Sequence, residues 1–232
     1  MHSEDRLIHF STELIHAPKK HTVQALQKLY YELSQTKHAY QNTDFTRPDR
    51  VRFHTARGEH TKSIALFLSD RILLAEEWTD LPLTSFLDKL ITVASQAVED
   101  LEVPAFAAQT VTLRSTFALS HFDNARDFMI EQVCGQRDTL QPFFQRPVAV
   151  GGMRLVLPET ADMPATVNVL MESYRHSENE VYAEVKAIFR KPPVKPENLF
   201  PLRERVRDAR AFMSSRVFPY LDQFDRPENA EA

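Results

Sequence analysis

The sequence is poor in cysteine and glycine and has no long apolar run. Its 232 residues include one cysteine, Cys134, which cannot form an internal disulfide and is typical of a reducing compartment. The four glycines form neither a P-loop nor a Gly-x-Gly-x-x-Gly fingerprint. No segment has the length of a membrane-spanning helix, and the polar start has no apolar core of a secretory signal. We therefore expect a cytoplasmic protein.

An excess of basic residues is also absent. The chain has 28 lysine and arginine residues against 32 aspartate and glutamate residues, and its formal net charge is -4. Nucleic acids and anionic membranes attract proteins through a positive field. We therefore expect neither a membrane nor a nucleic acid as a partner. With 43% hydrophobic and 26% charged residues, the composition is that of an ordinary globular protein.

Motifs of catalysis and metal binding are missing as well. His-Glu-x-x-His, Gly-x-Ser-x-Gly and cysteine pairs do not occur. His54 and His60 flank a predicted turn, but no carboxylate stands at a spacing that would complete a metal site. We interpret the nine histidines as surface or half-buried side chains, and Cys134 as a structural residue. No cofactor, metal ligand or catalytic residue is assigned.

Hydrophobic periodicity predicts an α+β fold. In the first half, period-2 alternation indicates strands at 6–16, 51–56, 63–68 and 71–78. Period-3.6 spacing indicates helices at 21–36 and 82–101, the second entered at Asp80 with Pro82 in its first turn.

The second half repeats this order of elements. Strands are predicted at 108–119, 148–157, 165–174 and 181–189, with a helix at 124–134. A long helix follows at 199–221, and Pro219 is expected to kink or loosen its last turns.

Two architectures fit this pattern. In the first, residues 1–102 and 103–226 are two pseudo-repeated β-α-β-β-β-α units that form antiparallel sheet packed on long helices, followed by a disordered tail at 227–232. In the second, residues 6–119 form a ferredoxin-like βαββαβ unit and the rest is an appendage. We prefer the internal duplication because it accounts for the whole chain.

A resemblance to a known family lies in residues 63–78, the helix that follows them and the strand around Arg114. They resemble a sporadically distributed bacterial family of unknown function, in which a Leu-Arg-Tyr-Ile-Asn strand follows such a helix. Here Leu113 and Arg114 match, whereas the next three residues differ. The resemblance implies an architecture, since that family has no agreed chemistry. The element order also resembles the tandem saddle of the TATA-binding protein, but that saddle is basic, so no DNA-binding residue is carried over.

Polar residues occupy one face of the strand at 108–119, which ought to be central. They are Thr110, Thr112, Arg114 and Thr116. Such a face either meets water or lines a pocket in which Arg114 anchors an anion. Arg114, Thr112 and Thr116 are therefore the candidate ligand-binding residues.

Two other charged sets have ordinary interpretations. Glu76 and Glu77 are adjacent in a strand and point to opposite faces, so they are expected to be edge residues rather than a catalytic pair. The last helix carries several arginines, which predict a solvated face or, alternatively, a site for an acidic partner. These are Arg203, Arg205, Arg207, Arg210 and Arg216.

Aromatic residues near a loop and the C-terminus suggest self-association. Phe143, Phe144, Phe218, Tyr220 and Phe224 lie in segments that look exposed, and exposed aromatics mark interaction sites. They would alternatively cap the ends of the sheet within one chain. The sequence thus favours a non-catalytic binding or interaction protein that forms a homo-oligomer. The alternative is an enzyme that binds a small anionic ligand around Arg114.

Overall fold

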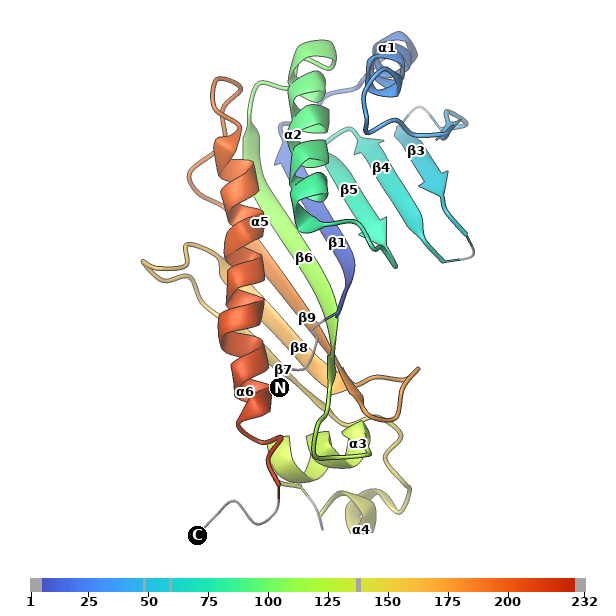
Figure 1. Cartoon of the computed structure of the whole chain (residues 1–232). Coiled ribbons are helices and arrows are strands. Elements are labelled where there is room, and N and C mark those ends of the chain that lie inside the picture. The colour runs from blue at the N-terminus through green and yellow to red at the C-terminus, as the bar shows by residue number, and fades with distance from the viewer. Residues whose placement is uncertain (1–5, 48, 59, 137–138, 228–232) are drawn as a thin grey trace.

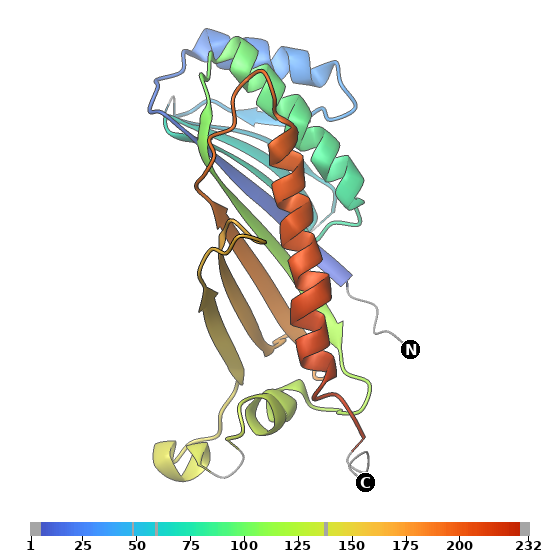
Figure 2. The same ribbon diagram turned by 90° about the vertical axis from the view of Figure 1, so that its left-hand side faces the viewer.

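One antiparallel sheet of nine strands carries long helices on one face (Figures 1 and 2). The computed structural model describes residues 6–227 except 48, 59 and 137–138. The strand order is β2-β3-β4-β5-β1-β6-β9-β8-β7. The strands are β1 Arg6–His16, β2 Asn42–Asp44, β3 Arg50–Ala56, β4 Lys62–Leu68, β5 Arg71–Glu77, β6 Phe106–Ala118, β7 Gly152–Leu157, β8 Thr166–Ser173 and β9 Glu180–Phe189.

The helices of the covered face come from both halves of the chain. They include α1 Val23–Ser34, α2 Leu83–Asp100, α5 Phe200–Phe212, the π-helical turn η2 Met213–Val217 and α6 Phe218–Asp222. Smaller helices, α3 Ala125–Asp127, η1 Phe128–Val133 and α4 Leu140–Phe144, lie at the lower end of the molecule in Figure 1. No helix among the described residues is both long and apolar enough to cross a membrane. The predicted α+β class is confirmed.

Strands β1 and β6 form the centre of the sheet. Each pairs with the other, and outward from this pair the strands follow the orders β5-β4-β3-β2 and β9-β8-β7. The boundary expected at residues 102 and 103 falls between α2 and β6, and the sheet is continuous across it. Strands β7, β8 and β9 therefore extend the same sheet and are not an appendage. The expected tail at 227–232 lies, apart from residue 227, outside the described residues.

Alternating burial explains which strand face meets the helices. In β9, every second residue from Val181 to Phe189 is buried, while the residues between them are partly exposed. The same period-2 pattern holds in β3, β4 and β8. Because alternate side chains point to opposite faces, the buried series packs under the helices and the other series forms an open face. The core thus lies between the sheet and its single layer of helices.

Helix starts differ in detail from the sequence expectation. Thr22 caps α1, since its Oγ1 accepts a hydrogen bond from the backbone N–H of Ala25 at 3.1 Å. Asp80 was expected to begin the next helix, but α2 begins at Leu83 with Pro82 at the cap position and no side-chain cap. The fixed φ of proline prepares this start without a hydrogen bond.

The C-terminal helix contains the irregularity predicted from Pro219. The π-helical turn η2 directly precedes α6, in which Pro219 occupies the first turn. Proline has no N–H to donate, so the regular α-helical pattern is interrupted before it. Beyond α6, the buried carboxylate of Asp225 accepts hydrogen bonds from the backbone N–H groups of Ser120 at 2.7 Å and His121 at 2.9 Å. These bonds attach the segment after α6 to the segment after β6.

Two expectations about exposed side chains are wrong. Phe218 is buried and stacks on Phe117 with 5.8 Å between ring centroids, because the π-helical turn rotates it toward the sheet. Arg205 is buried as well, with its guanidinium over the Phe189 ring and an Nη2 hydrogen bond to the Pro192 carbonyl. The arginine series on α5 is therefore not a uniformly solvated face.

Candidate functional site

A charged row crosses the open face of the sheet, opposite the helices. Glu77 on β5 is paired with His9 on β1, His9 with Arg114 on β6, and Arg114 with Glu184 on β9. Directly opposed residues in antiparallel strands point to the same face, with Cβ atoms about 5 Å apart. Four residues distant in sequence are thereby brought into one line across four strands.

A pocket of about 230 Å³ lies on this row, at the end of the strands where β5 ends and β9 begins. We call it the Trp78 pocket. Three aromatic residues contribute to its lining together with two histidines, one aliphatic residue and two charged residues of the row, Glu77 and Arg114. The lining residues are Ile8, His9, Glu77, Trp78, Arg114, Tyr174, His176 and Tyr182.

Hydrogen bonds and burial fix the charges within the Trp78 pocket. Arg114 Nε donates to Glu184 Oε2 at 2.7 Å, and the Tyr182 hydroxyl donates to the same oxygen at 3.2 Å. Burial, and then the carboxylate of Glu184, raise the pKa of Tyr182, so its phenol stays protonated. Burial and then the Arg114 charge lower the pKa of His9 to about 4. His9 is therefore neutral at physiological pH.

Trp78 has an unusual backbone conformation beside the pocket. Its φ is 49°, in the left-handed region that bulky residues rarely adopt. Its N–H donates to the Ile8 carbonyl at 2.7 Å, and its carbonyl accepts from Thr61 Oγ1 at 3.0 Å. These two bonds hold the strained residue, and 45% of it remains exposed. A large indole thus stays at the surface next to the charged row.

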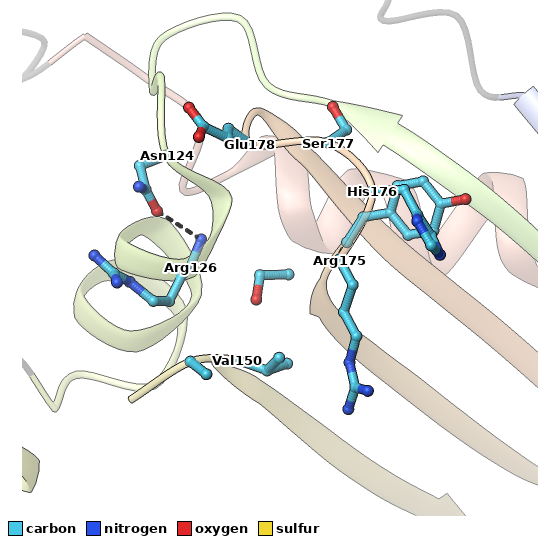
Figure 3. Close-up of a pocket in the computed structure, with 10 residues that line it drawn as sticks. Asn124, Arg126, Val150, Arg175, His176, Ser177 and Glu178 are labelled. Atoms are coloured by element: carbon cyan, nitrogen blue, oxygen red, sulfur yellow. Dashed lines mark hydrogen bonds between the residues drawn. The ribbon is translucent and has the colours of Figure 1, made fainter. Parts of the chain in front are cut away.

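A second pocket of about 420 Å³ adjoins the first, and we call it the Arg175 pocket. It lies between the N-terminal end of α3 and the turn that joins β8 to β9 (Figure 3). Arg126 and Arg175 flank it from two sides, with their guanidinium groups pointing away from each other. The side chain of Asn124 caps α3 by accepting from the backbone N–H of Arg126 at 3.0 Å. Both pockets are lined by Tyr174 and His176.

Of the three ligand-binding residues predicted from the sequence, only one lines the Trp78 pocket. Arg114 contributes to its lining. Thr112 and Thr116 lie on the same face of β6, but neither belongs to the lining. Thr112 is opposite Lys186, one row away, and Thr116 is buried opposite Tyr182. The expected polar face is present, and the pocket covers only one end of it.

Several lining residues were not found from the sequence. Alternation along β5 places Glu77 on the open face, and the single tryptophan of the chain directly follows it, which is the sequence signal that points to this pocket. Tyr174 and His176 belong to the β8–β9 turn, and only the strand order brings that turn next to Trp78. No local pattern contains this information.

The two adjacent glutamates have separate environments. They point to opposite faces as predicted, but β5 is an interior strand and not an edge. Glu76 is buried beneath α2, where Lys89 Nζ donates to its Oε1 at 2.5 Å and Ser63 Oγ donates at 2.8 Å. Glu77 instead faces the Trp78 pocket. In the described part of the chain, no group of three or more histidine, cysteine, aspartate and glutamate residues is placed to hold a metal ion.

Comparison with known proteins gives no match to a family model, a curated protein or a solved structure. The function is therefore inferred from the geometry of the two pockets and of the open face.

Proposed function

We propose that this chain is a non-catalytic binding protein whose ligand occupies the Trp78 pocket. The observation that carries the proposal is the set of aromatic side chains, Trp78, Tyr174 and Tyr182, around a charged row on an otherwise open sheet. Aromatic walls with a few oriented polar groups are typical of small-molecule sites.

The state of the polar groups supports binding rather than catalysis. A general base works best with a pKa near the operating pH, whereas the pKa of His9 is about 4. Arg114 and Tyr182 are already engaged with Glu184. These groups give the pocket a fixed shape and charge, and none of them is prepared to move a proton at neutral pH.

Trp78 provides a direct measurement of binding because it is the only tryptophan of the chain. A compound library is screened by thermal shift, and the compounds that stabilise the protein are then titrated while tryptophan emission is recorded. We expect these compounds to change Trp78 emission saturably and Tyr174→Ala to weaken them about tenfold, the cost of one aromatic contact. Tyr31→Ala, which removes an exposed ring on α1, is the matched control. Stabilising compounds that leave the emission unchanged would place the site elsewhere.

Self-association is a second proposal, supported by two phenylalanines on α4. Phe143 is 88% exposed and Phe144 is 68% exposed, although most phenylalanines of the chain are buried. Neighbouring exposed aromatics mark an interaction site, and a homodimer buries one such patch on both partners through its symmetry. Strand β7 is also at the edge of the sheet, with Val156 61% exposed.

The Phe143→Glu/Phe144→Glu variant tests this proposal. Light scattering across a dilution series is expected to show a dimer or larger species for the natural sequence and a monomer for the variant, because carboxylates cannot be buried in an apolar interface. The melting temperature should stay within about 2 °C, since exposed positions contribute little to folding. A monomeric mass for the natural sequence at high concentration refutes self-association.

We propose an internal duplication, which the matching outward strand orders from β1 and β6 support. The cytoplasm is proposed as the location because the chain has a single cysteine.

A further inference from the structure

The charges around the Trp78 pocket do not favour an anion. Two carboxylates, Glu77 and Glu184, accompany one guanidinium, Arg114, and His9 is neutral. Arg114 forms its ion pair with Glu184 at 2.7 Å, and Glu77 interacts with Arg114 only as a nearby charge, without a hydrogen bond. Among the described residues, Glu77 has no hydrogen-bond or ion-pair partner. Lys62 lies opposite Glu77 on β4 but does not line the pocket. Glu77 is therefore the lining carboxylate that is available to a cation.

The aromatic rings also favour a cation. The rings of Tyr174 and Tyr182 are nearly parallel, at 14° with 6.3 Å between centroids, and the exposed indole of Trp78 lines the same pocket from the end of β5. The face of an aromatic ring is electron-rich, and a cation over it is attracted through the ring quadrupole. Tryptophan gives the strongest such contact, and it lies directly after Glu77 in the chain.

We propose that the Trp78 pocket binds a small organic cation that carries an alkylammonium group. This inference rests on the proposed binding function and names its ligand class. The cation would lie against Trp78 and the two tyrosines, with Glu77 as its counter-charge. The volume of about 230 Å³ suits a head group rather than a drug-sized molecule. An anion would be repelled by Glu77 and would compete with Glu184 for Arg114.

The central experiment compares the binding of choline with that of its neutral carbon isostere, 3,3-dimethylbutan-1-ol. The two compounds have nearly the same shape and differ in charge. Each is titrated into the full-length protein at constant ionic strength, with Trp78 emission and melting temperature as readouts. We expect choline and tetramethylammonium to change the emission saturably and to raise the melting temperature. The isostere should bind at least tenfold more weakly, since it lacks the charge.

Three variants locate the cation. Glu77→Gln keeps the shape of the side chain, removes its charge and is expected to weaken choline about tenfold. Trp78→Ala should remove detectable binding, and calorimetry replaces fluorescence as its readout. Tyr31→Ala, which removes an exposed ring of α1 on the helical side of the sheet, should leave the affinity unchanged. If Trp78→Ala does not fold, two measurements still test the proposal. They are the comparison of choline with its isostere on the natural protein and the choline affinity of Glu77→Gln.

These experiments distinguish failure of the cation proposal from failure of the proposed binding function. Equal binding of choline and the isostere would show an apolar pocket and overturn the cation proposal. Absence of choline binding, with other compounds still changing Trp78 emission, would overturn the cation and leave the binding function intact. Binding of phosphate or acetate that Arg114→Ala removes would overturn it in favour of the anion site expected from the sequence.

Discussion

Replacement of Lys89 by methionine is expected to lower the free energy of unfolding by about 3–5 kcal/mol, because it leaves the buried carboxylate of Glu76 unpaired. Lys89 Nζ donates to Glu76 at 2.5 Å and to Ser63 Oγ at 2.7 Å, and it lies over the Tyr40 ring at 5.1 Å. Side-chain exposure is 8% for Lys89 and 7% for Glu76, so water cannot replace the lost partner. Urea denaturation followed by circular dichroism measures the change.

The double variant Lys89→Met/Glu76→Leu separates the pair from its surroundings. It removes both charges and should recover most of the lost stability, since apolar residues of similar volume often replace buried ion pairs without cost. A single variant as stable as the natural protein would contradict the prediction and show that water reaches the Glu76 carboxylate.

Replacement of Phe53 by alanine is expected to cost about 3–5 kcal/mol through the cavity that it leaves. Phe53 is fully buried in β3, and four aromatic rings surround it with centroids 4.9 to 6.2 Å away. These rings are those of Tyr30, Tyr40, Phe45 and Phe67. They come from α1, β4 and the segments around β2, so the cavity would weaken the packing of all these elements around β3. Guanidinium denaturation with tyrosine fluorescence provides the measurement.

Phe53→Leu is the graded control for this core position. Leucine keeps most of the volume and should cost less than half as much as alanine. Equal losses for leucine and alanine would indicate that ring stacking, rather than volume, stabilises the cluster. Phe143→Ala, at an exposed ring, should change the free energy by less than about 0.5 kcal/mol.

The buried pair and the candidate site are linked through β5. Glu76 anchors the inner side of the strand end to α2, and the next residue, Glu77, faces the Trp78 pocket. A register slip of one residue would exchange these two carboxylates between core and pocket. We therefore interpret the Lys89–Glu76 pair as a positioning feature that keeps Glu77 and Trp78 on the open face.

Strand and helix locations were largely predictable because each depends on local periodicity. The central strand around Arg114 and the helices after β5 and β9 were found from the spacing of hydrophobic residues. The three-residue strand β2 and the short helix α4 were missed, since segments of that length contain fewer than two full periods of a pattern. The wrong assignments of Phe218 and Arg205 have another origin, because π-helical geometry and a stacking partner from β9 decided their burial.

The sequence by itself determined the fold class and which side chains share a strand face, because these follow from periods of 2 and 3.6 residues along one segment. It placed Arg114 on the polar face of a central strand and separated Glu76 from Glu77. Only the tertiary structure decided that Glu77, His9, Arg114 and Glu184 form one row and that Tyr174 from a distant turn adjoins Trp78. The register between strands far apart in the chain sets these neighbours, and it results from burying the whole apolar face of the sheet at once.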